Sequence, residues 1–332
     1  MRGLRAIGTV ATSAALLASG CETANLDGPA VDARVLWNVG IPTLGPPAWD
    51  DSSIYFSSRL HSVVAVNRAT GAVRWTGYCC TIGDWITTER SPARTGNVLV
   101  FGDDDLVGFD AHTGVRLWTF TRDNGELVRA GVNLFQADGG RVYTGSYLGA
   151  AFALDATTGA VLWRTNLEST GNPQVRIHAV RDGRVYLTVR YGGPFYSAAA
   201  YALDAGSGAV LWRYDMGRSS ISHDVALTAP NATSQLLLVA LDDGSIAALS
   251  AQTGEERWVI DRPSPTNPSE RQLVVVGDRL VASATLTAQT GDYLAAYDLA
   301  TGNERWRVES EQGSVWGYYN MMASDGAHVY PI

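Results

Sequence analysis

The chain has 332 residues, of which 46% are hydrophobic, 17% are charged and 35 are Gly. This composition favours many short strands joined by glycine-rich turns, and the length permits a single all-β unit rather than three ordinary domains. A net charge of -8 without a basic cluster argues against nucleic-acid binding.

The N-terminal segment has the three parts of a secretory signal. Two Arg in the first five residues precede a small, apolar stretch over 6–20 that is too short and weak to span a membrane. Cys21, directly after Ala-Ser-Gly, resembles the lipobox of bacterial lipoproteins, with Ala18 in place of the usual Leu, and the resemblance implies that Cys21 is acylated. We therefore predict a signal peptide over 1–20 and a polar tether over 21–33. Secretion without an anchor is the alternative.

Beyond the tether the sequence repeats itself. Six segments contain an Asp, Asn or Ser, then a Gly four residues later and a Trp four residues after that Gly; they are 67–75, 110–118, 155–163, 204–212, 250–258 and 298–306. Successive Trp residues are 43, 45, 49, 46 and 48 residues apart. A period of this size indicates a repeat architecture such as a solenoid or a propeller.

Each part of the repeat has a physical role. The Asp-type residue ends one strand and accepts hydrogen bonds from the turn that follows. The Gly adopts the positive φ of a tight hairpin, and the Trp fills the gap between neighbouring sheets while its indole N–H requires a partner such as a backbone carbonyl. Alternating runs between the motifs, such as 54–56, 98–101 and 184–187, bring each period to about four strands. Four-stranded units stacked radially form a β-propeller.

The two ends of the repeat region complement each other. Val35–Trp37 matches the last strand of a repeat, whereas 317–322 and 328–330 match the first two strands of a repeat whose Trp never arrives. Joining the ends would complete a ring and cover both sheet edges. We predict a single propeller domain over 34–332 with seven four-stranded blades, with six or eight as alternatives. The composite blade lacks an obvious third strand.

The Asp-x-x-Thr-Gly-x-x-x-Trp unit is similar to the Trp-docking repeat of propellers of the pyrroloquinoline-quinone (PQQ) type. The resemblance implies that seven Trp side chains dock neighbouring blades: Trp37, Trp75, Trp118, Trp163, Trp212, Trp258 and Trp306. The superfamily includes quinoprotein alcohol dehydrogenases, which bind PQQ and calcium at the ring centre. It also includes non-catalytic members, such as the propeller lipoprotein of the outer-membrane β-barrel assembly machinery, which are often of this length.

Two features match the dehydrogenases. Cys79 and Cys80 are adjacent, as are two cysteines whose disulfide lies against PQQ in those enzymes, and Trp316 is a further candidate contact of the cofactor. His223-Asp224 resembles the stretch that carries the catalytic Asp, which makes Asp224 the candidate base. The alternative for the cysteines is a local clamp on a loop, or two thiols. The sequence has no convincing Glu and Asn pair for calcium, and no metal site is predicted.

The first strand of each blade is expected to place side chains in a central channel. The candidates are Arg90, Asn133, Gln136, Arg176, His178, His223, Asp224, Arg271, Trp316 and Asn320. Because the set is polar and includes three Arg, an anionic ligand or an acidic peptide could bind there. The alternative is a solvated channel in which Arg and Asp satisfy each other and ordered water.

The leading hypothesis is a non-catalytic β-propeller lipoprotein, secreted across the inner membrane and anchored through Cys21 in the outer membrane, facing the periplasm. It would present loops and channel to an envelope protein partner and would need no cofactor. The first alternative is a PQQ- and calcium-dependent periplasmic oxidoreductase of the alcohol dehydrogenase type. The second is a binding protein for a small anion or a saccharide.

Overall fold

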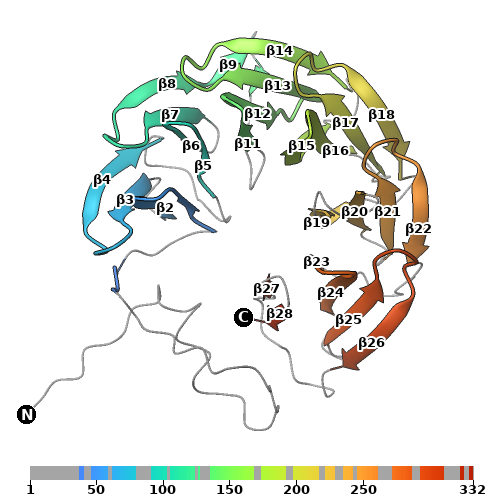
Figure 1. Cartoon of the computed structure of the whole chain (residues 1–332). Coiled ribbons are helices and arrows are strands. Elements are labelled where there is room, and N and C mark those ends of the chain that lie inside the picture. The colour runs from blue at the N-terminus through green and yellow to red at the C-terminus, as the bar shows by residue number, and fades with distance from the viewer. Residues whose placement is uncertain are drawn as a thin grey trace, which may run out of the picture. The chain divides into compact units, whose positions relative to one another are not determined.

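A computed structural model of the chain describes residues 37–40, 46–58, 62–79, 91–102, 105–123, 126–127, 135–167, 173–191, 197–216, 221–228, 235–241, 245–260, 271–285, 292–309, 322–324 and 329–331. The regular elements in these ranges are strands (Figure 1). Within the same ranges, no helix is both long and apolar enough to cross a membrane. The predicted signal peptide, Cys21 and the tether lie outside the described residues.

The chain divides into two compact units, 1–142 with 154–162, and 143–153 with 163–332. The first unit contains two four-stranded sheets. One comprises β1 (Ala48–Trp49), β2 (Ser53–Ser58), β3 (Ser62–Asn67) and β4 (Val73–Tyr78), and the other β5 (Ala93–Thr95), β6 (Val98–Gly102), β7 (Leu106–Asp110) and β8 (Arg116–Phe120). A small hairpin follows, formed by β9 (Arg122–Asp123) and β10 (Glu126–Leu127).

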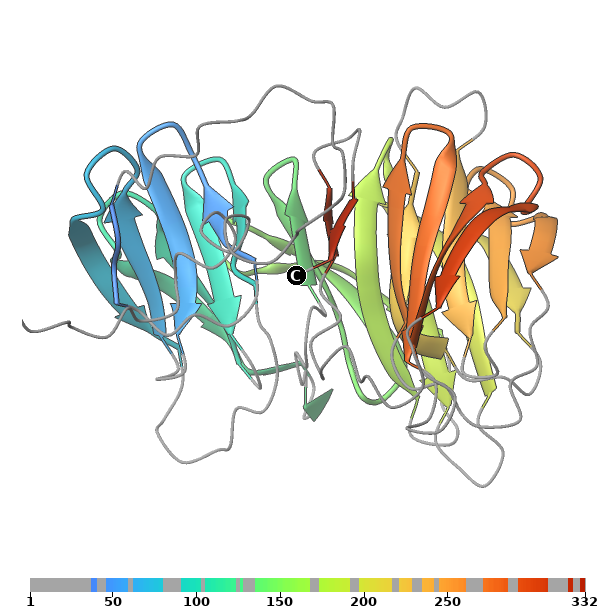
Figure 2. The ribbon, with the colours of Figure 1, turned by 90° about the horizontal axis from the view of Figure 1, so that it is seen from below.

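The second unit contains three four-stranded sheets of the same kind. They comprise β15 (Gln174–Arg181), β16 (Arg184–Tyr191), β17 (Ser197–Asp204) and β18 (Val210–Asp215); β19 (Ile221–Leu227), β20 (Leu236–Leu241), β21 (Ile246–Ser250) and β22 (Glu256–Ile260); and β23 (Arg271–Val276), β24 (Arg279–Thr285), β25 (Asp292–Asp298) and β26 (Glu304–Glu309). Within each sheet, strands that follow one another in the chain are hydrogen-bonded neighbours, and Figure 2 shows these strands from a second direction.

A further four-stranded sheet contributes residues to both units, and a two-stranded sheet ends the second unit. The former comprises β11 (Phe135–Asp138), β12 (Arg141–Gly145), β13 (Ala150–Asp155) and β14 (Val161–Asn166), and the latter β27 (Met322–Ser324) and β28 (Val329–Pro331). β28 overlaps the second predicted C-terminal strand, 328–330. Most of the first, 317–322, lies outside the described residues, and β27 overlaps it at Met322 alone.

These sheets confirm the prediction of an all-β chain with four antiparallel strands per repeat, because six such sheets occur among the described residues. Burial explains the composition. The middle strands β20 and β21 are buried along their whole length, which requires apolar residues on both faces. The outer strand β22 alternates instead, since only alternate side chains point into the core.

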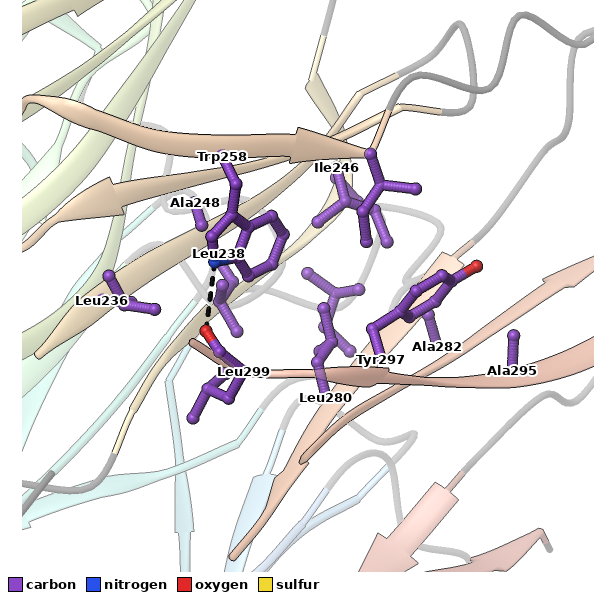
Figure 3. Close-up of a cluster of buried hydrophobic side chains, with 13 residues drawn as sticks. Leu236, Leu238, Ile246, Ala248, Trp258, Leu280, Ala282, Ala295, Tyr297 and Leu299 are labelled. Carbon is purple, nitrogen blue, oxygen red and sulfur yellow. Dashed lines mark hydrogen bonds between the residues drawn. The ribbon is translucent and has the colours of Figure 1, made fainter. Parts of the chain in front are cut away.

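Neighbouring sheets pack face to face through apolar side chains. Figure 3 shows the cluster between the β19–β22 and β23–β26 sheets, where Trp258, Leu238 and Ile246 meet Leu280 and Tyr297. In the outer strands β4, β8, β18, β22 and β26, the Trp lies opposite an Ala or Gly of the third strand, as Trp258 lies opposite Ala248. In that pair of strands the register shifts between Ala248 and Leu249. Such a bulge bends the strand locally and changes the direction of nearby side chains, so the Trp258 side chain can reach across to the next sheet.

Candidate functional site: docking turns, Cys79 and the inner strands

The Asp turns are built by the residues that the repeat supplies. The carboxylate of Asp110 accepts hydrogen bonds from the Thr113 backbone N–H and hydroxyl, both at 2.8 Å, and from the His112 N–H at 3.1 Å. These bonds, that from the Thr113 hydroxyl first, lower the pKa of Asp110. Gly114 then donates its N–H to the Asp110 carbonyl at 2.8 Å with a φ of +72°, a conformation that favours glycine.

Each turn receives the Trp of the preceding repeat rather than that of its own. The Trp75 indole N–H donates to the carbonyl of Ala111, the residue after the turn Asp, at 3.0 Å. A Cβ at Gly114 would lie 2.6 Å from the Trp75 ring, so the Gly is required for this contact as well as for its φ. The same bond, at 2.7–3.1 Å, joins six pairs: Trp37–Arg68, Trp75–Ala111, Trp118–Ala156, Trp163–Ala205, Trp212–Ala251 and Trp258–Leu299.

Two of these carbonyls also meet a tyrosine that sequence reasoning did not single out. The Tyr55 hydroxyl lies 3.2 Å from the Ala111 carbonyl and 2.7 Å from the Asp50 carboxylate. Burial and this hydrogen bond to Asp50 raise the pKa of Tyr55 to about 12, which keeps the phenol protonated as a donor. Tyr143 lies 3.4 Å from the Ala205 carbonyl in the same way. A Val-Tyr or Ile-Tyr pair in the second strand is the signal that could have found them.

Cys79 is a core residue. Its side chain is 4% exposed and packs with Tyr55, Phe101 and Phe109 between the first two sheets. It stands four residues after Trp75, and the matching positions after Trp163 and Trp212 are Leu167 and Met216, which also pack into cores between sheets. A thiol enclosed in this way does not fit a sulfur stacked on a quinone ring. Cys80 lies outside the described residues.

Arg176 and His178 are two residues apart on β15, and the register of β15 with β16 shifts between Ile177 and Ala179, on either side of His178. His178 Nε2 lies 2.7 Å from the hydroxyl of Thr188, across the β15–β16 pair. Burial, together with the positive charge of Arg176, lowers the pKa of His178 to about 3, so its imidazole is neutral at pH 7. A neutral imidazole bonded to a hydroxyl is a structural element of the inner hairpin rather than a cation for a ligand.

The structure describes only some of the remaining predicted site residues. His223 and Asp224 lie in β19, Arg271 begins β23 and Gln136 lies in β11, whereas Arg90, Asn133, Trp316 and Asn320 lie outside the described residues. The described part of the chain contains no group of three or more His, Cys, Asp or Glu side chains placed to hold a metal ion. The roles of these residues in a channel or in catalysis stay predictions.

Comparison with known proteins places the repeat in a family. A family model described as outer membrane protein assembly factor BamB matches residues 29–185 and 153–315. No curated protein sequence matches the chain.

Solved structures share the fold at low sequence identity. The crystal structure of BamB from Moraxella catarrhalis is 19% identical, with a TM-score of 0.59 over 83% of this chain and 79% of that one. A europium-containing methanol dehydrogenase is 12% identical (TM-score 0.61, 84% and 74% covered). Quinohemoprotein alcohol dehydrogenase from Comamonas testosteroni is 17% identical (TM-score 0.61, 83% and 62% covered). At such identities the likeness concerns the fold alone.

Proposed function

This chain belongs to the family described as outer membrane protein assembly factor BamB, and from that premise we propose that it is a non-catalytic interaction scaffold of the bacterial envelope, serving outer-membrane protein assembly. The observation that carries the proposal is the family match over both halves of the repeat region, residues 29–185 and 153–315. The chemistry of the described residues supports it. The Asp, Thr, Gly and Trp of the repeat are engaged in docking sheets to one another, which leaves recognition to loops and rims.

The experiment is a deletion in the source bacterium. Cells that lack the chain should hold less folded outer-membrane β-barrel protein, as measured by heat-modifiable mobility on gels, and a plasmid copy should restore the amount. A Trp258→Ala copy should restore less, because a destabilised scaffold is less abundant. Unchanged outer-membrane protein in the deletion strain would contradict the assembly role.

The anchor is a separate part of the proposal. Acylation of Cys21 would hold the propeller at the outer membrane, since two or more acyl chains give stable membrane attachment. A Cys21→Ser variant should move from the membrane fraction to the soluble periplasmic fraction. Identical partitioning of the two proteins would refute the anchor.

We also propose seven blades, the seventh beginning with β27 and β28 and ending with Val35–Trp37. β27 lies against β23, the first strand of the preceding sheet. In the β27–β28 pair Ala323 faces Tyr330, as Ala48 faces Tyr55 and Ala179 faces Tyr186 in the first hairpins of two complete sheets. At the other end, Trp37 docks on the turn of the first sheet as the last strand of a preceding blade would.

A further inference from the structure

We propose that the hairpin turn between β15 and β16 carries a carboxylate-binding site, formed by Arg181, Arg184 and the hydroxyl of Tyr186, which takes an acidic side chain of a protein partner. This inference rests on the proposed scaffold function, for which it supplies a recognition site. All three residues belong to the second compact unit.

The first observation is a pair of like charges at a tight turn. Arg181 and Arg184 face each other in the register of β15 and β16. The two residues between them, Asp182 and Gly183, have φ values of +51° and +71°, as a two-residue hairpin turn requires. Like charges directly opposite each other destabilise a pair of strands, so an anion bound between the two guanidinium groups would stabilise this hairpin.

The second observation is that the nearby acidic groups are engaged elsewhere. The Asp182 carboxylate accepts a hydrogen bond from Nε2 of Gln235 at 2.9 Å. Asp204, which faces Arg184 from β17, accepts hydrogen bonds from the Ser207 N–H and hydroxyl at 2.8 and 2.7 Å. Within the part of the chain that the structure describes, neither guanidinium group at the turn forms an ion pair.

The third observation is that both guanidinium groups are held in place. Nη1 of Arg181 donates to the Thr228 carbonyl of the neighbouring sheet at 2.7 Å. Nε of Arg184 is buried and has no hydrogen-bond partner among the described residues. A buried donor without an acceptor is costly, so a ligand oxygen at this Nε would remove that cost. Arg279, which faces the docking-turn Asp of its own sheet in the same way, lies 3.5 Å from the Asp278 carboxylate.

The first sheet shows how a carboxylate is held at the same place. Asp50 stands two residues after the partner of Tyr55 in the strand register. Arg181 stands at the same distance from the partner of Tyr186. The Asp50 carboxylate accepts the Tyr55 hydroxyl at 2.7 Å and lies 3.6 Å from Nε of Arg94. One phenol and one guanidinium group thus hold a carboxylate in the first sheet.

The β15–β18 sheet offers the same two donor types without an internal carboxylate. Burial raises the pKa of Tyr186, and the positive charges of Arg184 and Arg181 act against this shift, so both guanidinium groups lie near its hydroxyl. A protonated phenol and two Arg match an ionised carboxylate, which only accepts hydrogen bonds. The turn residues Asp182 and Gly183 are exposed, so a side chain of a partner protein can approach from solvent.

A fluorescein-labelled peptide of five Gly-Glu repeats tests the inference by fluorescence anisotropy with the purified chain. The peptide should bind although the chain carries a net charge of -8, and Arg184→Gln should weaken binding about tenfold, because a charge-assisted hydrogen bond is lost. The control is Arg257→Gln, an exposed Arg of β22 that lies 3.7 Å from Glu255, which should leave the affinity unchanged. No binding, or equal losses in the two variants, overturns the inference.

Arg181→Asp gives an independent measurement. It places in this sheet the carboxylate that Asp50 supplies in the first one, so the site is filled from within and peptide binding should be lost. Circular dichroism checks the fold of each variant, and Arg184→Gln keeps the test decisive if Arg181→Asp does not fold. Peptide binding that survives in folded Arg181→Asp overturns the inference. Acetate that displaces the peptide at equal carboxylate concentration would make a small free carboxylate the ligand and overturn the assignment to a protein partner.

Failure of the proposed function is distinguishable from failure of this site. Peptide binding that depends on Arg184, in a chain whose deletion leaves outer-membrane protein unchanged, rejects the assembly role alone. A loss of outer-membrane protein on deletion, without peptide binding by the purified chain, rejects the carboxylate site alone.

Discussion

The indole N–H of Trp258 donates to the carbonyl of Leu299 at 3.1 Å (Figure 3), and a Cβ at Gly302 would come within 2.8 Å of the Trp258 ring. The Trp belongs to one sheet and both its partners to the turn of the next. This relationship recurs along the chain, so the stability of each sheet depends on the side chain of its predecessor.

Removal of a docking Trp should be costly. Trp258→Ala should lower the free energy of unfolding by about 3–5 kcal/mol, because a large cavity forms between two sheets. Trp258→Phe retains most of the packing but leaves the Leu299 carbonyl without its donor, at a smaller cost of about 1–3 kcal/mol before repacking. Urea unfolding followed by circular dichroism measures both. Trp49→Ala is the control, since Trp49 is 63% exposed and should change stability by less than about 0.5 kcal/mol. Equal losses of unfolding free energy in Trp258→Ala and Trp49→Ala would contradict the docking role.

Substitution of two glycines separates the energetic cost of displacing the Trp ring from the cost of a positive φ. Gly302 and Gly277 have φ values of +71° and +57°, but a Cβ at Gly277 would meet nothing within 4 Å. Gly277→Ala should therefore cost only the backbone penalty of about 1–2 kcal/mol. Gly302→Ala should cost about 1–3 kcal/mol more, because the added methyl group must displace the Trp258 ring. Identical midpoints of the two variants in urea would show that the ring can move aside.

Cys79 should behave as a buried apolar residue. Cys79→Ala should be tolerated better than Cys79→Ser, because burial among the aromatic side chains of this core removes a serine hydroxyl from water, at a cost of about 1–3 kcal/mol. A disulfide with Cys80 would instead make the two substitutions equally harmful. Thermal unfolding with and without reductant distinguishes these outcomes.

Titration with PQQ and calcium should produce no bound-quinone absorbance, and stoichiometric uptake would refute the non-catalytic proposal.

His178 should make stability fall in mild acid. Its pKa is lowered from the ordinary histidine value of 6.5 to about 3 in the folded chain, so between these two pH values the unfolded chain binds the extra proton. The contribution of this residue is therefore fully present above about pH 6.5 and is lost as the pH falls toward 3, at up to about 1.4 kcal/mol per pH unit. His178→Gln should lose less stability between pH 6.5 and 4.5 than the unchanged chain. Parallel pH profiles would contradict the assigned pKa.

The repeat allowed the architecture to be predicted because its signals are local. Hairpin turns at Gly114 and Gly302 depend on φ values that a short stretch of sequence reveals, and the period shows how many strands lie between them. The docking partner of each Trp, in contrast, lies far from it in the sequence. Gly and Trp of one repeat look like parts of one hairpin, yet each Trp ring docks on the turn of the following repeat. That contact forms only when two sheets pack together.

Cys79 shows the opposite difficulty. Its adjacency to Cys80 suggested redox chemistry, whereas its distance from Trp75 matches those of Leu167 from Trp163 and Met216 from Trp212. The same position is polar in three other repeats, where it is Arg122, Arg262 and Ser310, so comparison across the repeats would not by itself have indicated a core residue. Tyr55 and Tyr143 needed the strand register, which sets the face on which a side chain emerges.

Site-specific photocrosslinking in living cells tests the scaffold role most directly. A photoreactive residue would be placed at the exposed positions Val115, Leu211 and Thr157, and at the fully buried Ala202 as the control. The scaffold proposal predicts a crosslinked product with an outer-membrane assembly protein from at least one exposed position and none from Ala202. Products absent from every exposed position, in cells where the protein is abundant and folded, would contradict it.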